Sequence, residues 1–255
     1  MDASTPAGAA RPIQLTGPRH NALLAALPPE ELQLLGSALD VVTLTAGERL
    51  IQAGAPLEAV YFPITAIVSI VYIMAGGATT ELAMTGREGV VGTALFADEL
   101  ASSDAIVQCG GSAIRLATGP LRAAIARGGM LPQLLMRNAN ALFTQIALTT
   151  VGSQHSSVEQ KLCRWLLDRR DRSASNDLEV TQESIAVLLG VRRESITGAI
   201  GKLQQAGAIC CRRGRITVAD RPALELHAGE CYQAARTAAD RWRATAPTAR
   251  RPLRG

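Results

Sequence analysis

The stretch TQESIAVLLGVRRESITGAIGKLQQAGAI, from Thr181 to Ile209, decides the fold of the C-terminal part of the chain. It contains two apolar helical segments separated by a glycine. Three charged residues, Arg192, Arg193 and Glu194, stand together at the start of the second segment. This arrangement predicts a helix-turn-helix, in which two short helices pack across a tight turn. The three charges would then lie at the N-terminus of the second helix.

The inward positions of the stretch fit that motif. Counted from Gln182, the fifth, ninth and fifteenth residues are Ala186, Gly190 and Ile196. The fifth must be small because it faces the other helix, the ninth lies in a turn where glycine accepts a positive φ, and the fifteenth is buried. The remaining inward positions hold apolar side chains: Ile185, Leu189, Val191 and Ala199. Thr181 is the predicted N-cap of the first helix.

The outward positions of the second helix are the candidates for reading DNA bases: Arg192, Arg193, Glu194 and Thr197, followed by Gly198. In a helix-turn-helix the N-terminal end of the second helix enters the major groove. Arginine can bind guanine through O6 and N7, and glutamate can accept from cytosine N4. A merely solvated helix end is the alternative, but two arginines there oppose the helix dipole. The pattern therefore favours DNA recognition.

The segment GAICCRRGRITVADR that follows predicts a β-hairpin. Its strands are expected at Ala208 to Arg212 and at Arg215 to Val218, joined by Arg213 and Gly214. A hairpin with several arginines directly after a recognition helix is typical of a wing. We expect Arg213, Arg215 and the N-cap Thr181 to contact phosphates.

Composition and charge agree with a DNA-binding C-terminal third. The 255-residue chain is 47% hydrophobic and 19% charged, which indicates a globular protein of two modest domains. Residues 1–159 hold 8 basic and 12 acidic residues, whereas residues 160–255 hold 18 and 10. A basic C-terminal third on an acidic body suggests a polyanion partner, although a solvated basic face would look the same.

A membrane or secreted location is not expected. The longest nearly apolar run, Ala66 to Ala75, is about half the roughly 20 residues that a membrane helix needs. The N-terminus has an acid at Asp2 and no apolar core segment, so it does not resemble a signal peptide. We expect a cytoplasmic protein without a membrane partner.

The reactive residues do not predict an enzyme, a metal site or a cofactor. The five cysteines fit neither a disulfide framework nor the spacing of a zinc site. No triad, paired-carboxylate or phosphate-loop pattern is visible. Adjacent cysteines rarely form an unstrained disulfide with each other, so one of Cys210 and Cys211 is expected to face the core. A redox switch at this pair stays an alternative.

The N-terminal part has a different pattern. Pro28 and Pro29, followed by two glutamates, predict the start of a short helix. From Val41 the chain consists of short β-branched runs cut by glycines, with a hairpin signal at Gly76-Gly77 and two more strands around Gly110-Gly111. Frequent turns between short strands indicate an antiparallel sandwich or barrel.

A long, weakly charged helix is expected between the two parts, over roughly Leu131 to Val151. Its apolar stripe must be covered, either by a second copy of the helix or by the chain's own β domain, and the periodicity leaves both open. A further helix, VEQKLCRWLLDRRDR, precedes the polar segment SASND.

In this order of elements the chain resembles the CRP/FNR superfamily of transcription regulators, over about residues 20 to 226. The resemblance is carried by VTQESIAVLLGVRRESITGAIGKLQQAGAI, by SVEQKLCRWLLDRRDR and by LTAGERLIQAGAPLEAVYFPITAIVSIV. It implies an α+β fold with an antiparallel, jelly-roll-like β-roll, a long dimerisation helix and a C-terminal winged helix-turn-helix. The expected divisions are a flexible N-terminus (1–19), a sensor β-roll (20–122), the dimerisation helix and hinge (123–155), the DNA-binding domain (156–243) and a flexible tail (244–255).

The resemblance also implies site residues. The family's Arg-Glu pair matches Arg193 and Glu194, a serine-like contact position matches Thr197, and a basic residue that usually follows is replaced by Gly198. The effector pocket is expected at Glu88 and Gly89, with Ser102 and Ser103 at the phosphate position of cyclic-nucleotide-binding members.

The effector end departs from the family pattern. No arginine lies between Arg87 and Arg115, so a cyclic phosphate would have no charge-assisted partner. We therefore predict no cyclic AMP binding, and a cyclic-AMP-type regulator with a diverged site is the alternative. The predicted partners are double-stranded DNA and a second copy of the chain, with a small-molecule effector and RNA polymerase as further candidates. The other classes considered were a β-barrel enzyme and a cyclic-nucleotide-controlled module acting on proteins.

Overall fold

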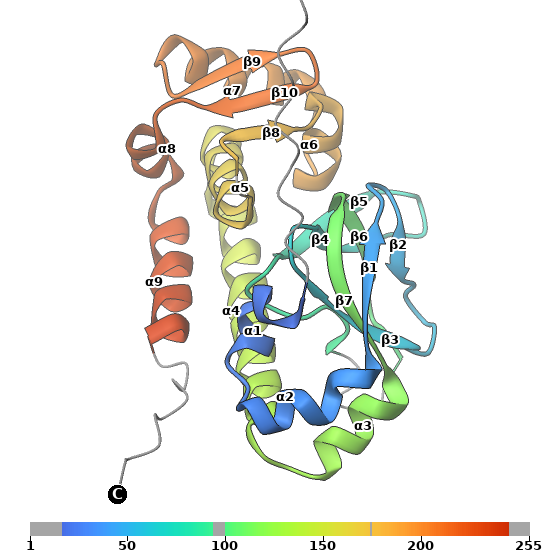
Figure 1. Cartoon of the computed structure of the whole chain (residues 1–255). Helices are drawn as coiled ribbons and strands as arrows, with labels where there is room; N and C mark the ends of the chain where they lie inside the picture. The colour runs from blue at the N-terminus through green and yellow to red at the C-terminus, as the bar shows by residue number, and fades with distance from the viewer. Residues whose placement is uncertain (1–16, 94–99, 174, 245–255) are drawn as a thin grey trace, which may run out of the picture.

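The computed structural model describes residues 17–93, 100–173 and 175–244 (Figure 1). The N-terminal half opens with two short helices, α1 (Ala22–Ala25) and α2 (Pro29–Leu35), flanked by 3-10 turns at Pro18–His20 and Gly36–Ala38. As predicted, α2 begins at the second residue of the Pro-Pro pair. Seven strands follow: β1 (Leu39–Leu44), β2 (Arg49–Ile51), β3 (Ala59–Pro63), β4 (Ile67–Ile73), β5 (Thr79–Thr85), β6 (Asp104–Cys109) and β7 (Gly111–Ala117).

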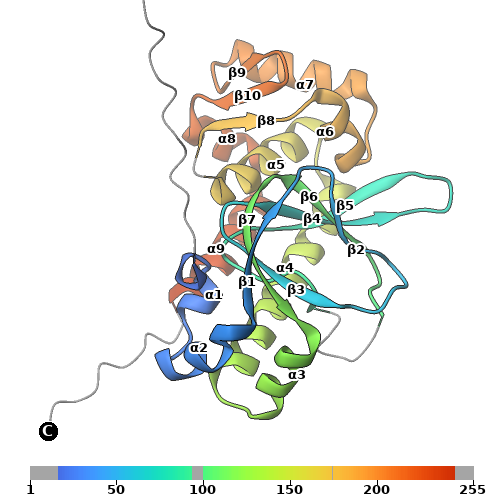
Figure 2. The ribbon, with the colours of Figure 1, turned by 45° about the vertical axis from the view of Figure 1, so that its right-hand side comes forward.

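The seven strands form two antiparallel sheets that face each other as a β-roll (Figure 2). One sheet has the order β1-β7-β3 and the other the order β2-β6-β4-β5. The predicted hairpin joins β4 to β5, and Gly77 turns the chain with φ 85°. The chain changes sheet at the other glycine pair, where a Cβ on Gly111 would lie 2.5 Å from Thr65 Oγ1. The antiparallel β-roll predicted from the sequence is confirmed.

Three helices lead away from the β-roll: α3 (Thr118–Ala126), α4 (Met130–His155) and α5 (Val158–Arg172). The helix α4 has 26 residues and extends the predicted helix by about a turn at its C-terminal end. A capping box starts α5: the Ser157 hydroxyl accepts from the backbone N–H of Gln160, and the Gln160 side-chain oxygen accepts from the backbone N–H of Ser157.

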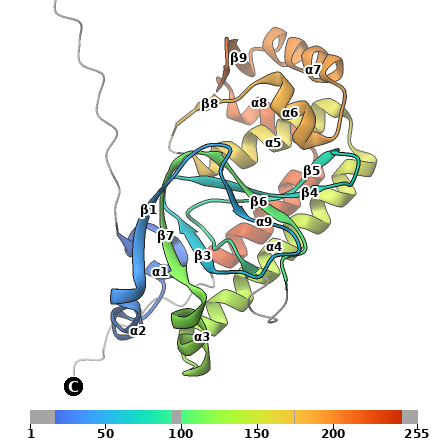
Figure 3. The same ribbon diagram turned by 90° about the vertical axis from the view of Figure 1, so that its right-hand side faces the viewer.

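The C-terminal part is a winged helix-turn-helix followed by two helices. Its elements are β8 (Asp177–Glu179), α6 (Gln182–Leu189), α7 (Arg193–Gln205), β9 (Ile209–Arg212), β10 (Arg215–Val218), α8 (Arg221–Ala228) and α9 (Glu230–Ala244). The last helix, α9, lies alongside α4 (Figures 1 and 3). No helix of the described ranges is long and apolar enough to cross a membrane.

The two ends of the molecule share a core. One cluster of buried residues joins Ile67, Val71 and Met84 of the β-roll to the apolar faces of α5, α6 and α7. Figure 3 shows α6 resting against the β4–β5 end of the roll. The winged helix-turn-helix is therefore packed onto the β-roll in this conformation, and is attached by more than α4.

The apolar stripe of α4 is covered in part by the chain's own β domain. Leu131, Leu134 and Leu135 are buried in one cluster with Phe62 and Ile114 of the β-roll. The β domain therefore covers the first turns of α4, one of the two alternatives that the sequence leaves open. Further along, Met136 and Phe143 remain 66% and 70% exposed.

Candidate nucleic-acid interface

The helix-turn-helix is built by α6, a one-glycine turn and α7. Thr181 caps α6 by accepting from the Ser184 N–H at 3.1 Å. Gly190 ends α6 in the left-handed conformation, with φ 63°, as the sequence predicts. The Val191 N–H then donates to Ala186 O at 3.0 Å, which closes the turn. The local sequence thus dictates both the end of α6 and the angle at which α7 begins.

The predicted inward positions hold the two helices together. Ala186 is buried where α6 meets α7, and Ile196 is fully buried on α7. Ile185 and Ala199 are buried as well, while Leu189 and Val191 are half-buried against the same core. The pattern read from the sequence is confirmed at each of these positions.

The first turns of α7 present an exposed polar face. Arg192 occupies the N-cap position, and Arg193 and Glu194 are the first helical residues. These three side chains and Thr197 are exposed, as are Ser195 and Gly198. The structure therefore brings all four predicted base-reading residues onto one exposed helix end. Ser195 is an additional exposed hydroxyl that the sequence reasoning passed over.

Two of these residues are held by the first turn of α6. Arg193 Nη1 lies 3.5 Å from Glu183 Oε2, in a pair that is about two-thirds exposed on both sides. Thr197 Oγ1 lies 2.8 Å from Gln182 Oε1 and 3.1 Å from the carbonyl oxygen of Arg193. Gln182 and Glu183 were not among the predicted site residues, because contacts between the two helices do not follow from helix periodicity.

The wing has three strands. β9 and β10 lie where the sequence predicts them, and β8 adds to the outer edge of β10, giving the order β8-β10-β9. The strand β8 was missed because its segment is short and polar. Gly214 makes the turn with φ 73°. Arg213, beside it, is exposed, and it has no ion pair with any described residue.

The other two predicted phosphate contacts already have partners. Arg215 lies between two acids of β8, 3.3 Å from Asp177 and 3.5 Å from Glu179. Thr181 serves the α6 cap, and its hydroxyl lies 3.0 Å from Ser184 Oγ. Both are exposed at the surface, so a phosphate could reach either one, but it would compete with these contacts.

The adjacent cysteines behave as expected from their alternation on a strand. Cys210 is exposed, whereas Cys211 is half-buried against the core. Burial raises the pKa of the Cys211 thiol. Both thiols are free.

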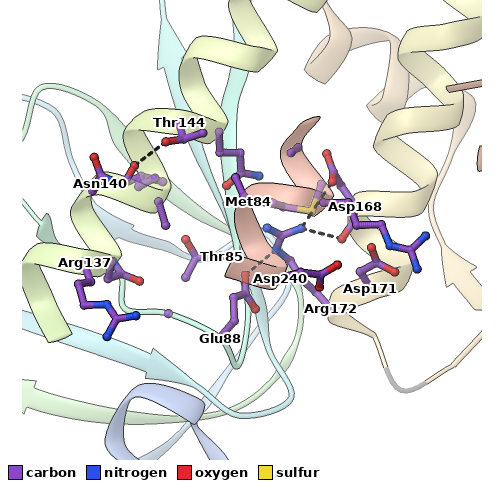
Figure 4. Close-up of a pocket in the computed structure, with 18 of the residues that line it drawn as sticks. Met84, Thr85, Glu88, Arg137, Asn140, Thr144, Asp168, Asp171, Arg172 and Asp240 are labelled. Carbon is purple, nitrogen blue, oxygen red and sulfur yellow. Dashed lines mark hydrogen bonds and ion pairs between the residues drawn. The ribbon is translucent and has the colours of Figure 1, made fainter. Parts of the chain in front are cut away.

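A cavity of about 950 Å³ lies where the β-roll, α4, α5 and α9 meet (Figure 4). Glu88 and Gly89 line it, as do Asp168 and Arg172 of α5. Ser102 and Ser103 do not belong to its lining, so the four predicted pocket residues do not come together here. The register explains this: Asp104 at the start of β6 pairs with Val71, near the hairpin end of β4, while Glu88 follows the opposite end of β5.

The charged groups of this cavity are largely paired with each other. Arg172 Nε lies 2.7 Å from Glu88 Oε1, which links α5 to the loop after β5. Burial opposes the charge of Arg172, but Glu88 and Asp168 outweigh burial and raise its pKa. Arg221 is bonded to Asp171 and Glu225 at 2.6 and 2.7 Å. An anionic ligand would have to displace carboxylates to use either guanidinium.

A buried acid lies at the same junction. Glu81 of β5 is 8% exposed and accepts a hydrogen bond from the Ser69 hydroxyl of β4. Its pKa is raised to about 7, chiefly by burial and also by the nearby Asp168, against the opposing effects of the Ser69 hydrogen bond and of Arg172 and Arg169. The described residues contain no group of three or more side chains that could hold a metal ion.

Comparison with known proteins adds an independent result. Residues 160–226 match the family of Crp-like helix-turn-helix domains. This segment is similar to a Crp-like helix-turn-helix domain. It covers α6, α7 and the wing, together with most of α5 and α8. A search of curated proteins finds no significant match to the chain.

Solved structures share the fold of most of the chain at low identity. A Crp/Fnr-family regulator from Eubacterium rectale has a TM-score of 0.66 at 15% identity, covering 83% of this chain and 100% of that one. A CRP-family regulator from Thermus thermophilus has a TM-score of 0.64 at 18% identity, covering 76% and 99%. FixK2 from Bradyrhizobium japonicum has a TM-score of 0.66 at 15% identity, covering 75% and 98%. The fold is thus that of CRP/FNR regulators, and the resemblance seen in the sequence is confirmed.

Proposed function

We propose that this protein is a sequence-specific DNA-binding transcription regulator that acts as a homodimer on a two-fold symmetric site. The observation that carries the proposal is the exposed N-terminal end of α7, where Arg192, Arg193, Glu194 and Thr197 project from a Crp-like helix-turn-helix. Side chains at this end of a recognition helix reach base edges in the major groove. Arg213 and Arg215 of the wing, together with Thr181 at the start of α6, supply the proposed phosphate contacts.

The proposed dimer contact is a stripe of exposed apolar side chains on α4. Met136, Phe143 and Val151 are exposed on this helix, at 66%, 70% and 47%. Spacings of seven and eight residues place them on one stripe, as in a helix that pairs with a copy of itself. Pairing along this stripe is proposed to set the two recognition helices about 34–36 Å apart, one turn of the duplex.

We propose that this protein is a regulator and not an enzyme, because it carries a Crp-like helix-turn-helix and because solved structures of the same fold are described as regulators. We propose that it works in the cytoplasm on double-stranded DNA, with RNA polymerase as a further partner.

For an effector, we propose the cavity beside Glu88 and Gly89, because it touches the β-roll, α4 and α5 at once. A ligand there could separate Glu88 from Arg172 and loosen α5 from the β-roll. Ser102 and Ser103 stay a prediction from the family resemblance. Cyclic AMP is not the expected ligand, and an isothermal titration should show no micromolar binding.

The test of the DNA-binding proposal is the variant Arg193→Ala. Loss of a base-contacting arginine should weaken binding to a selected site by about 1–3 kcal/mol per half-site. Binding to unrelated duplexes should change much less, since Arg193 is proposed to read bases. Fluorescence anisotropy with both duplexes measures the ratio. An unchanged ratio of specific to non-specific affinity would contradict direct readout by Arg193.

A further inference from the structure

The hydroxyl of Thr197 has two acceptors within the protein and only one proton. Gln182 Oε1 lies 2.8 Å away, and the carbonyl oxygen of Arg193 lies 3.1 Å away. Whichever oxygen takes the proton, the hydroxyl has none left for DNA. Thr197 is exposed on the recognition face, so it offers DNA a lone pair and a methyl group.

This state of the hydroxyl has a consequence for base selection. In the major groove, adenine presents an amino group at N6 and cytosine one at N4, whereas the edge of guanine presents only the acceptors N7 and O6. A hydroxyl that can only accept is complementary to an amino group. It is not complementary to guanine.

We propose that Gln182 is a positioning residue that fixes Thr197 as an acceptor, so that the base facing Thr197 is selected as adenine or cytosine and guanine is disfavoured. This inference rests on the proposed DNA-binding function and deepens it. Gln182 is the first residue of α6 and is half-buried, and its side chain contacts Thr197. The helices α6 and α7 lie beside each other (Figure 3).

Gln182 has a second group to offer. Its amide oxygen faces Thr197, and among the described residues none is hydrogen-bonded to its amide nitrogen. The nitrogen belongs to the first turn of α6, where backbone N–H groups and the helix dipole favour an anion. The amide can therefore donate to a DNA phosphate while its oxygen orients Thr197.

The test compares selected sites for the full chain and three variants: Gln182→Ala, Gln182→Glu and Thr197→Val. Random duplexes are selected and sequenced, and affinities are then measured on the wild-type site with each base at the position that Thr197→Val changes. A thermal melt of each variant checks that the fold is kept.

The wild type should disfavour guanine at one position of each half-site. Gln182→Ala leaves Thr197 only the longer, 3.1 Å contact to the Arg193 carbonyl, which the hydroxyl can give up in order to donate to guanine. The variant should therefore reduce that discrimination at least about fivefold, which is the low end of the usual cost of a mismatched base pair. Gln182→Glu keeps an acceptor beside Thr197, so it should keep the base preference. It should also bind all sequences more weakly, because it replaces the amide donor by a negative charge.

Three outcomes would overturn the inference. If Gln182→Ala keeps the wild-type preference at every position, Gln182 does not set the readout of Thr197. If the wild type selects a symmetric site but tolerates guanine at the position changed by Thr197→Val, DNA binding stands and the acceptor assignment is wrong. If the wild type selects no site at all, the proposed function fails, and this inference fails with it.

Discussion

Replacing Glu81 by glutamine should make the protein more stable at neutral and alkaline pH. Glu81 is buried between the β-roll and α5, and its pKa is about 7, compared with an ordinary value of 4.5. Glutamine has the same shape, can accept the same hydrogen bond from Ser69, and never ionises. The variant therefore removes the cost of a buried negative charge without opening a cavity.

The size and sign of the effect follow from proton linkage. Above pH 4.5 the unfolded chain releases the Glu81 proton first, while the folded protein keeps it until about pH 7. The contribution of Glu81 to stability is thus complete below pH 4.5 and is lost as the pH rises toward 7. A difference of about 2.5 pKa units corresponds to about 3 kcal/mol. Burial also raises the pKa of Asp168, which adds to the loss in the same direction.

Urea unfolding at pH 4, 6 and 8 measures this dependence. Wild type and Glu81→Gln should have similar unfolding free energies at pH 4, and the variant should be more stable by about 3 kcal/mol at pH 8. The matched control is Glu58→Gln, since the Glu58 side chain is exposed; its curve should follow that of the wild type. Parallel curves for wild type and Glu81→Gln would refute the buried-acid argument.

Three further predictions concern the helix-turn-helix, the dimer and the wing. Gly190→Ala should lower the free energy of unfolding in urea by about 1–2 kcal/mol, because φ at this position is 63°. Gly198→Ala should raise it by about 0.5–1 kcal/mol, because this glycine lies inside a helix with open space around its Cβ. Equal effects of the two substitutions would contradict the turn assignment. Phe143→Glu should yield a monomer in sedimentation equilibrium with its thermal stability kept, since the side chain is 70% exposed, and a persistent dimer would move the interface elsewhere. Arg213→Ala should weaken binding to all duplexes alike and lower the salt dependence by about one counterion per protomer; a sequence-dependent loss would make it a base contact.

The helix-turn-helix could be predicted in detail because its signals are local. The small residue at Ala186, the left-handed turn at Gly190 and the buried Ile196 lie within fifteen residues, and each position has a steric reason that a single sequence reveals. The strands of the wing and the β4–β5 hairpin were predicted for the same reason, since glycine turns mark them.

The contacts that join distant segments could not be predicted in this way. Glu88 and Arg172 are 84 residues apart, and nothing in either segment indicates the other. The buried position of Glu81 also depends on how α5 packs on the β-roll. The helix α9 could have been predicted from the sequence, because Tyr232, Ala235 and Ala238 recur at helical spacing. In the structure these three residues line the cavity beside α4. The place of α9 along α4 nevertheless required the structure.

The central claim is tested most directly by selecting random duplexes with the purified protein, without ligand and in parallel with cyclic AMP. The account predicts that one two-fold symmetric site, with half-sites about one helical turn apart, is enriched in both selections. Enrichment only with cyclic AMP would contradict the predicted absence of cyclic AMP binding. Enrichment of no symmetric site in either selection would contradict sequence-specific DNA binding by a homodimer.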